Sequence, residues 1–138
     1  MTSDRIANAA VLCPSKLSGH ARGGGARTTP LVTRKVGSTS LLNGITEFEP
    51  GAAIPLHTHN CEESVMVLEG EAIAEIDGSP HRMAAGDTTW VAADVPHRFI
   101  NASATHAMRI FWTYASIEAT RTIVATGETR RIDAEASG

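Results

Sequence analysis

The chain has 138 residues, a length that fits one domain able to bury its own core. Its composition, with 42% hydrophobic and 20% charged residues, is typical of a globular protein. The net charge is −3 and the basic residues are scattered, which argues against nucleic acid as a partner. No apolar run approaches the ~20 residues that span a bilayer, so we expect no membrane association.

The first segment along the chain, residues 1–30, is rich in Ala, Ser and Gly and contains the tract Gly23-Gly24-Gly25. Glycine loses the most backbone freedom on ordering. We therefore expect residues 1–30 to form a flexible N-terminal arm. The two cysteines, Cys13 and Cys61, are too few for a disulfide framework. Reduced thiols, and an apolar stretch too short for a signal peptide, lead us to expect a cytoplasmic protein.

The central part of the chain, residues 31–126, is punctuated like an all-β protein. Runs of β-branched and apolar residues alternate with turn signals, and Asp77-Gly78 is a strong hairpin signal. The expected strands cover, in chain order, residues 40–48, 64–68, 71–76, 81–83, 88–92, 97–101, 108–114 and 120–125. Short strands at such regular spacing predict a sandwich or a barrel. Residues 127–138 are polar, and we expect a C-terminal tail.

A candidate metal site begins at the sequence His57-Thr58-His59. Residues two apart on a strand point to the same face, so both imidazoles can be aimed at one point. Glu63 follows a short turn and can return from the neighbouring strand, and His97 can close the site from another strand. Three imidazoles and one carboxylate suit a divalent transition metal ion, either Fe, Mn, Ni, Co or Zn.

The spacing of these residues resembles the two sequence motifs of the cupin family. The first motif matches at Gly51, His57, His59, Glu63 and Gly70, and the second at Gly86, His97 and Asn101. Agreement by chance at all of these positions is on the order of one in 10¹⁰ per starting point. The second motif departs at Ala92, where the family has Pro, and at Asp94, where it has Gly. Pro96 can supply the missing rigidity, and Asp tolerates the left-handed conformation of Gly.

The resemblance is to the small, single-domain (type-2) metal-binding cupins. It implies an antiparallel jelly-roll barrel over residues 31–126, with one metal ion inside its mouth. Family members commonly form dimers, so we expect a homodimer with a small-molecule ligand or substrate.

Strand parity predicts the side chains around the metal. Val65 and Val67 share the face of Glu63, and Phe99 shares the face of His97. The expected substrate pocket is therefore largely apolar.

The strand over residues 108–114 leaves two alternatives for the rest of the pocket. One face carries Trp112 as a pocket wall and Tyr114 as a candidate catalytic residue. The other face carries Arg109, which could anchor a carboxylate. Parity does not decide between them, so Tyr114 and Arg109 are both catalytic candidates.

Four protein ligands leave two octahedral positions open, which favours an enzyme over a structural metal site. We expect action on a small polar metabolite that chelates the metal through oxygen, in an oxygenase or isomerase type of reaction. A lyase is less favoured by the resemblance, because Val65 stands where single-domain cupin lyases of the dimethylsulfoniopropionate type carry a catalytic Tyr. The alternative is a non-catalytic small-molecule-binding or sensor cupin. An inward-facing Tyr114 or Arg109 would favour the enzyme.

Overall fold

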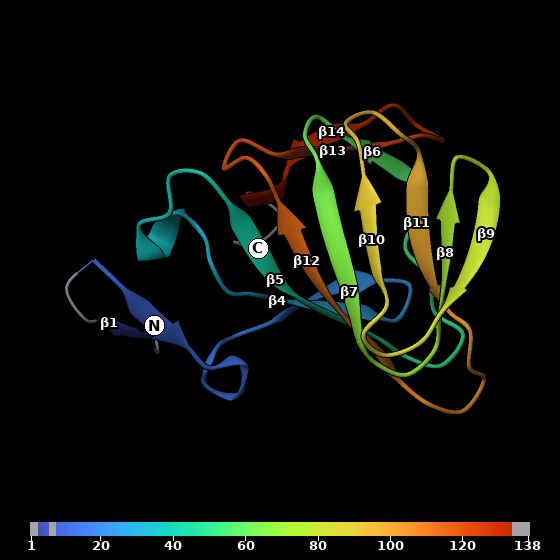
Figure 1. The fold of residues 1–138 in the computed structure, drawn as a ribbon, viewed down its shortest axis with the longest axis horizontal. Helices are drawn as coiled ribbons and strands as arrows, with labels where there is room; N and C mark the ends of the chain where they lie inside the picture. Colours follow the sequence, from blue (N-terminus) through green and yellow to red (C-terminus); the bar gives the residue numbers. More distant parts are fainter. Residues whose placement is uncertain (1–2, 6–7, 134–138) are drawn as a thin grey trace.

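The computed structural model describes residues 3–5 and 8–133, and its strands build two antiparallel six-stranded sheets that pack face to face (Figure 1). The first sheet contains, in spatial order, β10 (Thr88–Val91), β7 (Glu63–Glu69), β12 (Met108–Tyr114), β5 (Leu42–Phe48), β4 (Ala26–Pro30) and β3 (His20–Gly23). The second contains β14 (Thr129–Arg131), β13 (Thr120–Ile123), β6 (His57–His59), β11 (His97–Asn101), β8 (Ala72–Ile76) and β9 (Ser79–Met83). The all-β antiparallel fold expected from the sequence is therefore confirmed, and it is that of a jelly roll.

A short hairpin of β1 (Ser3–Arg5) and β2 (Ala10–Leu12) stands apart from the two sheets at the left of Figure 1. Two 3-10 turns, η1 (Pro14–Lys16) and η2 (Arg34–Val36), interrupt the connections. Among the residues described, no helix is long and apolar enough to cross a membrane.

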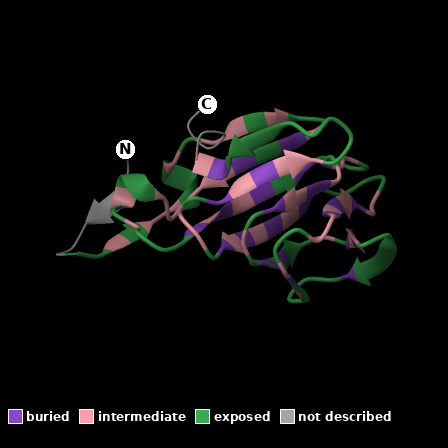
Figure 2. Ribbon diagram, turned by 90° about the horizontal axis from the view of Figure 1, so that it is seen from above, coloured by how far each residue is buried: buried purple, intermediate pink, exposed green. Residues whose placement is uncertain are grey.

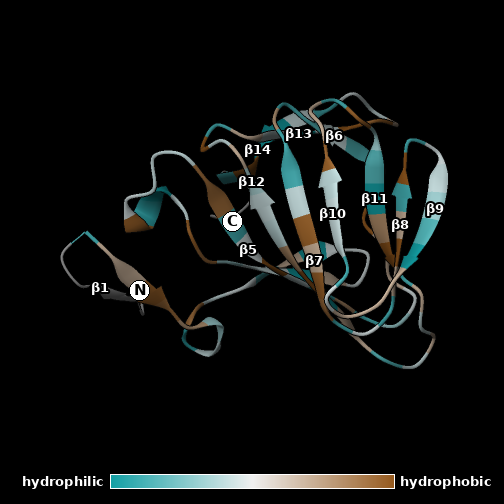
Figure 3. Cartoon of the chain, in the orientation of Figure 1, coloured by the Kyte–Doolittle hydropathy of each residue, from teal (hydrophilic) through white to brown (hydrophobic). Residues whose placement is uncertain are grey.

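The core lies between the sheets and is built by alternation of burial along the inner strands, such as β5 and β11 (Figure 2). Buried and half-buried residues alternate without a break along β12. Buried and exposed residues alternate along β7 from Glu63 to Leu68, although Figure 3 shows that its middle is continuously hydrophobic. This alternation resolves the open choice for residues 108–114. The side chains that face inward are Met108, Ile110, Trp112 and Tyr114.

The first sheet includes residues that the sequence assigned to the N-terminal arm. β4 pairs with β5 from Ala26↔Phe48 to Pro30↔Gly44, and β3 pairs with β4. The tract Gly23-Gly24-Gly25 has φ values of 83°, 64° and 85° and forms the turn between these strands. Glycine adopts this left-handed region without steric cost, so the tract reverses the chain. The flexibility expected of the arm stays a prediction.

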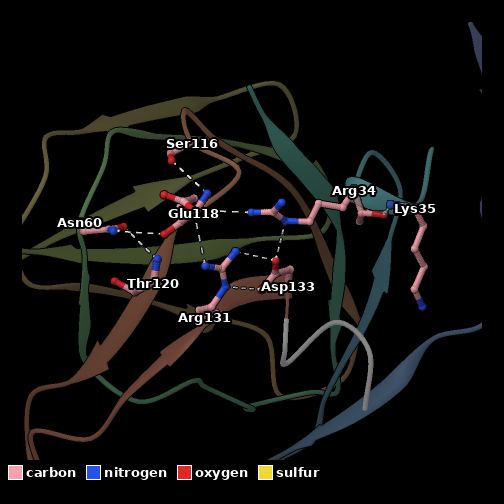
Figure 4. Close-up of polar contacts among 9 residues, drawn as sticks. Arg34, Lys35, Asn60, Ser116, Glu118, Thr120, Arg131 and Asp133 are labelled. Carbon is pink, nitrogen blue, oxygen red and sulfur yellow. Dashed lines mark hydrogen bonds and ion pairs between the residues drawn. The ribbon is translucent and has the colours of Figure 1, made fainter. Parts of the chain in front are cut away.

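The C-terminal residues 129–133 are also tied to the fold. β14 pairs with β13, and Ile132 is buried. Arg34 of η2 contacts Asp133 at 3.2 Å, and Arg131 contacts the same carboxylate at 2.9 Å (Figure 4). Glu118, at 3.7 Å from Arg34 and 3.8 Å from Arg131, completes this ion-pair cluster. The cluster joins the chain before β5 to the end of β14.

Candidate metal centre

The four side chains expected as metal ligands converge between the sheets. His57 and His59 lie on β6, His97 lies on the adjacent β11, and Glu63 comes from β7 of the opposite sheet. One ligand atom from each residue lies within 4.8 Å of the others, and each residue is at most 4% exposed. The period of two along a strand places His57 and His59 on the inner face, as expected.

The turn before His97 forms although Ala92 and Asp94 depart from the family motif. Asp94 has a φ of 67°, so it takes the left-handed conformation expected of it. Its backbone N–H donates to the carbonyl of His59 at 2.8 Å. This bond ties the loop to β6 and helps to set His97 beside His57, its partner in the strand pairing.

Each of the three imidazoles is oriented by a backbone carbonyl. The Nδ1–H groups donate to the oxygens of Pro55 (2.7 Å, from His57), Thr120 (2.9 Å, from His59) and Val95 (2.9 Å, from His97). A carbonyl can only accept, so Nδ1 carries the proton and Nε2 is the nitrogen left for a ligand. Such outer contacts fix ring orientation and tautomer in metal sites.

The polar atoms at the centre fit a bound cation. His59 Nε2, His97 Nε2 and Glu63 Oε1 are buried and have no hydrogen-bond partner among the residues described. His97 Nε2 lies 2.9 Å from Glu63 Oε1 but without the alignment of a hydrogen bond. Buried polar atoms are otherwise almost always paired. The cluster is therefore positioned to bind a metal ion.

The electrostatics of the cluster favour an ionised Glu63 and a neutral His57. Burial lowers the pKa of His57 to about 3, and the neighbouring imidazoles add to this effect. Burial alone would raise the pKa of Glu63, but His59 and His97 outweigh it and hold that pKa well below its usual range. Burial would lower the pKa of His97, but Glu63 outweighs this effect and raises that pKa above its usual value. A metal ion must therefore displace a proton from His97 when the pH lies below the raised pKa.

The wall of the site contains aromatic rings from β12. The ring of Tyr114 lies 4.6 Å from that of His59, and the ring of Trp112 lies 5.2 Å from that of Tyr114. Val65, Val67 and Phe99 are buried in the same core, as strand parity predicted.

The interior is not wholly apolar, which the sequence pattern did not indicate. Trp112 Nε1–H donates to Thr46 Oγ1 at 2.9 Å, and that hydroxyl lies 2.8 Å from Thr28 Oγ1. Both threonines are buried. A row of hydroxyl groups therefore runs inward from β4 to the aromatic wall.

Arg109, one of the two catalytic candidates, does not join the cluster. It lies between the buried Met108 and Ile110 and faces out of the sheet. Its guanidinium is 3.9 Å from Glu47 and 4.0 Å from Glu69, and its side chain is one third exposed. Alternation along β12 sends Tyr114 and Arg109 to opposite faces, so only one of them can reach the metal.

Two residues near the site were missed by sequence reasoning. Arg121 of β13 is directly opposite His59 in the strand pairing and is 9% exposed. Asn60 holds the segment that orients His59: its side chain accepts from Thr120 N (2.8 Å) and donates to the carbonyl of Glu118 (3.2 Å) (Figure 4). Neither role is visible without the pairing of β13 with β6.

The two packed sheets and the His₃Glu cluster define a single-domain cupin of the metal-binding type. The family model of the cupin domain matches residues 44–114, more than half of the chain. The chain therefore belongs to the cupin family, as the sequence motifs indicated.

The chain is also similar to individual known proteins. Over 54 residues the chain is 41% identical to dimethylsulfoniopropionate lyase DddW of Ruegeria pomeroyi, covering 39% of this chain and 36% of the lyase. Over 91 residues it is 34% identical to protein SchB of Streptomyces halstedii, covering 65% of each chain. The chain thus spans about a third of one curated relative and just under two thirds of the other. The structure of the polyketide cyclase RemF from Streptomyces resistomycificus has the same fold, with a TM-score of 0.71, 17% identity, and coverage of 88% of this chain and 84% of that one.

Proposed function

We propose that this protein is a mononuclear metal-dependent enzyme that acts on a small polar metabolite through oxygen atoms of that metabolite. The reaction is of the oxygenase or isomerase type. The observation that carries the proposal is the convergence of four buried ligand atoms, three of them without a hydrogen-bond partner in the described chain, beside an inward-facing tyrosine.

Four protein ligands would hold one divalent ion, with His57, His59 and His97 bound through Nε2 and Glu63 through a carboxylate oxygen. The bound ion would polarise a substrate oxygen and orient it for reaction. The backbone carbonyls behind the imidazoles keep the three rings in place when substrate enters. An ion held by four protein ligands would have room to bind two oxygens of the substrate as well.

Tyr114 favours an enzyme over a binding protein. Its ring packs against that of the ligand His59, and its phenol is a group that can give or take a proton. The tyrosine is held from behind by Trp112, which is itself fixed by Thr46. A rigidly placed acid–base group beside a metal is useful for turnover and unnecessary for storage.

The proposal is tested by turnover. Protein loaded separately with Fe(II), Mn, Ni, Co or Zn is incubated with 2-hydroxy acids, 2-oxo acids, enediols and dimethylsulfoniopropionate. Oxygen uptake and product masses are followed, with His59→Ala as the metal-deficient control. We expect turnover of at least one compound, and its loss in both His59→Ala and Tyr114→Phe.

The contrary result is equally specific. If a compound binds the metal-loaded protein tightly but is neither oxidised nor rearranged, and Tyr114→Phe does not change its affinity, the protein is a non-catalytic binding or sensor cupin.

We infer further that the protein forms a homodimer through the outer face of the first sheet. Trp90, Met66 and Leu68 are 66%, 40% and 39% exposed on β10 and β7, an unusual density of apolar surface for a monomer. Light scattering measures the mass in solution, and Trp90→Lys should shift it toward that of one chain.

The cytoplasmic location stays a prediction, consistent with two free thiols.

A further inference from the structure

Gly44 is an unusual residue for the interior of a strand. It lies on the buried inner face of β5, between the inward-facing Leu42 and Thr46. Its φ is not positive, unlike that of Gly78 in the β8–β9 turn, so its backbone conformation does not require glycine. Glycine weakens a strand interior and often marks a place where another group comes close to the backbone. The reason for glycine at this position must therefore be space.

The space above Gly44 is occupied by the indole of Trp112. The two residues are directly opposite each other in the pairing of β5 with β12. A Cβ atom on Gly44 would lie 2.5 Å from Cζ2 and 2.8 Å from Cη2 of Trp112, and 2.8 Å from the carbonyl oxygen of Thr29. Non-bonded carbon atoms prefer separations of about 3.5–4.0 Å. The six-membered ring of the indole therefore rests on the backbone of Gly44, where any side chain would collide with it.

A second residue of β5 holds the same edge of the indole. Trp112 Nε1–H donates to Thr46 Oγ1 at 2.9 Å, and Thr46 is two residues after Gly44 and on the same face. Both Trp112 and Thr46 are buried, so water cannot easily replace this hydrogen bond. β5 carries no candidate metal ligand, yet it fixes the position of the indole at two points.

The position of the indole is passed on to the metal centre through Tyr114. The rings of Trp112 and Tyr114 are 5.2 Å apart, and the ring of Tyr114 is 4.6 Å from that of His59. Tyr114 is also directly opposite Glu63 in the pairing of β12 with β7. Buried rings at such separations are in close contact, and close-packed interiors transmit strain. A displaced indole must therefore displace the ring of Tyr114.

We propose that Gly44 is a positioning residue for Tyr114. The absence of a side chain lets the indole of Trp112 lie against β5, where Thr46 fixes it, and the indole in turn holds the tyrosine ring beside His59. A Cβ atom at position 44 points inward and pushes the indole off the sheet, toward the interior. The inference rests on the proposed function for what Tyr114 does there, whereas the placement of the rings needs neither metal nor substrate.

Nuclear magnetic resonance with ring-labelled tyrosine tests the placement, because Tyr114 is the only tyrosine of the chain. Full-length protein is studied both loaded with Zn and stripped of metal. The wild type should show nuclear Overhauser cross-peaks from the Tyr114 ring to the rings of Trp112 and His59. Gly44→Ala should shift the Tyr114 ring signals and remove the cross-peaks to His59 in both forms.

Two further variants make this test specific. Thr46→Val keeps the shape of the side chain but removes the acceptor of the indole N–H, and it should weaken the cross-peaks between Tyr114 and His59. Thr113→Val is the matched control, since it makes the same substitution next to Tyr114 on the opposite face of β12. Its Tyr114 signals should be those of the wild type.

Unchanged Tyr114 signals and cross-peaks in folded Gly44→Ala overturn the inference, even if that variant melts at a lower temperature, because Gly44 then serves packing alone. Equal changes in Thr113→Val overturn it as well. If Gly44→Ala does not fold, as judged by circular dichroism, Thr46→Val decides the question.

Failure of the proposed function gives a different result. In turnover of a compound that the wild type transforms, Gly44→Ala should lower kcat by about tenfold or more at wild-type metal content, because the acid–base group is misplaced. A wild type that transforms no compound, but whose Tyr114 cross-peaks to His59 disappear in Gly44→Ala, contradicts the proposed function and leaves the positioning role of Gly44 intact.

Discussion

His59 donates its Nδ1 proton to the backbone carbonyl of Thr120, 61 residues further along the chain, at 2.9 Å. Asn60 follows His59 in the chain, and its side chain forms hydrogen bonds with the same segment. It accepts from Thr120 N and donates to the carbonyl of Glu118. Asn60 therefore joins the candidate ligand His59 to the segment whose backbone carbonyl orients the His59 ring.

Asn60→Ala should weaken metal binding by up to about tenfold, because outer contacts of metal ligands are typically worth 10- to 100-fold and Asn60 acts one step further out. Asn43→Ala is the matched control, since it removes a comparable side-chain to backbone bond, to Val32 N, from β5, a strand that carries none of the candidate ligands. Metal competition titrations measure both affinities. Equal affinities in the two variants would show that Asn60 has no positioning role.

Removal of a ligand should have a larger effect. His97→Ala leaves two imidazoles and one carboxylate, and we expect metal content after dialysis to fall from about one ion per chain to near zero. His81→Ala, at an exposed position on β9, removes an imidazole without touching the centre and should retain full metal. Elemental analysis of the purified variants provides the measurement, and stoichiometric metal in His97→Ala would refute the ligand assignment.

Metal binding should weaken as the pH falls through neutrality. Glu63 raises the pKa of His97 above its usual 6.5, so below that raised pKa a proton competes with the metal for Nε2. Affinity then falls by up to about tenfold per pH unit. His57 adds nothing to this loss, because its pKa is lowered to about 3 and it stays neutral. The check is a metal titration at pH 8, 7 and 6, and a flat response would contradict it.

The ion-pair cluster at the chain ends should stabilise the fold in a pH-dependent way. Arg131, and then Arg34, hold the pKa of Asp133 below its usual 3.8. The stabilisation is therefore present above that value and lost as the pH falls through the lowered pKa. Asp133→Asn should cost less than about 1 kcal/mol at pH 7, because both arginine partners are largely exposed to solvent, and it should cost less at pH 2. Thermal unfolding of the variant and of the wild type at both pH values measures this loss, and a deficit that does not change with pH would contradict it.

Much of the fold was accessible from the sequence because strand boundaries are local. Turn signals such as Asp77-Gly78 separate the runs, and the strand at Met108–Tyr114 has the predicted limits. The Gly23–Gly25 tract was interpreted as a source of flexibility, and in the structure it forms the turn between β3 and β4. That turn depends on the pairing of β3 with β4, which the sequence pattern did not indicate.

The sequence by itself identified the candidate metal ligands, because two histidines on one strand share a face and their spacing to Glu63 and His97 is that of a family motif. The tertiary structure alone decided which face of β12 meets the His₃Glu cluster, and so placed Tyr114 inside and Arg109 outside. It also brought Arg121 beside His59. The physical reason is that local alternation fixes which residues share a face, whereas burial of that face depends on strand pairing between distant segments.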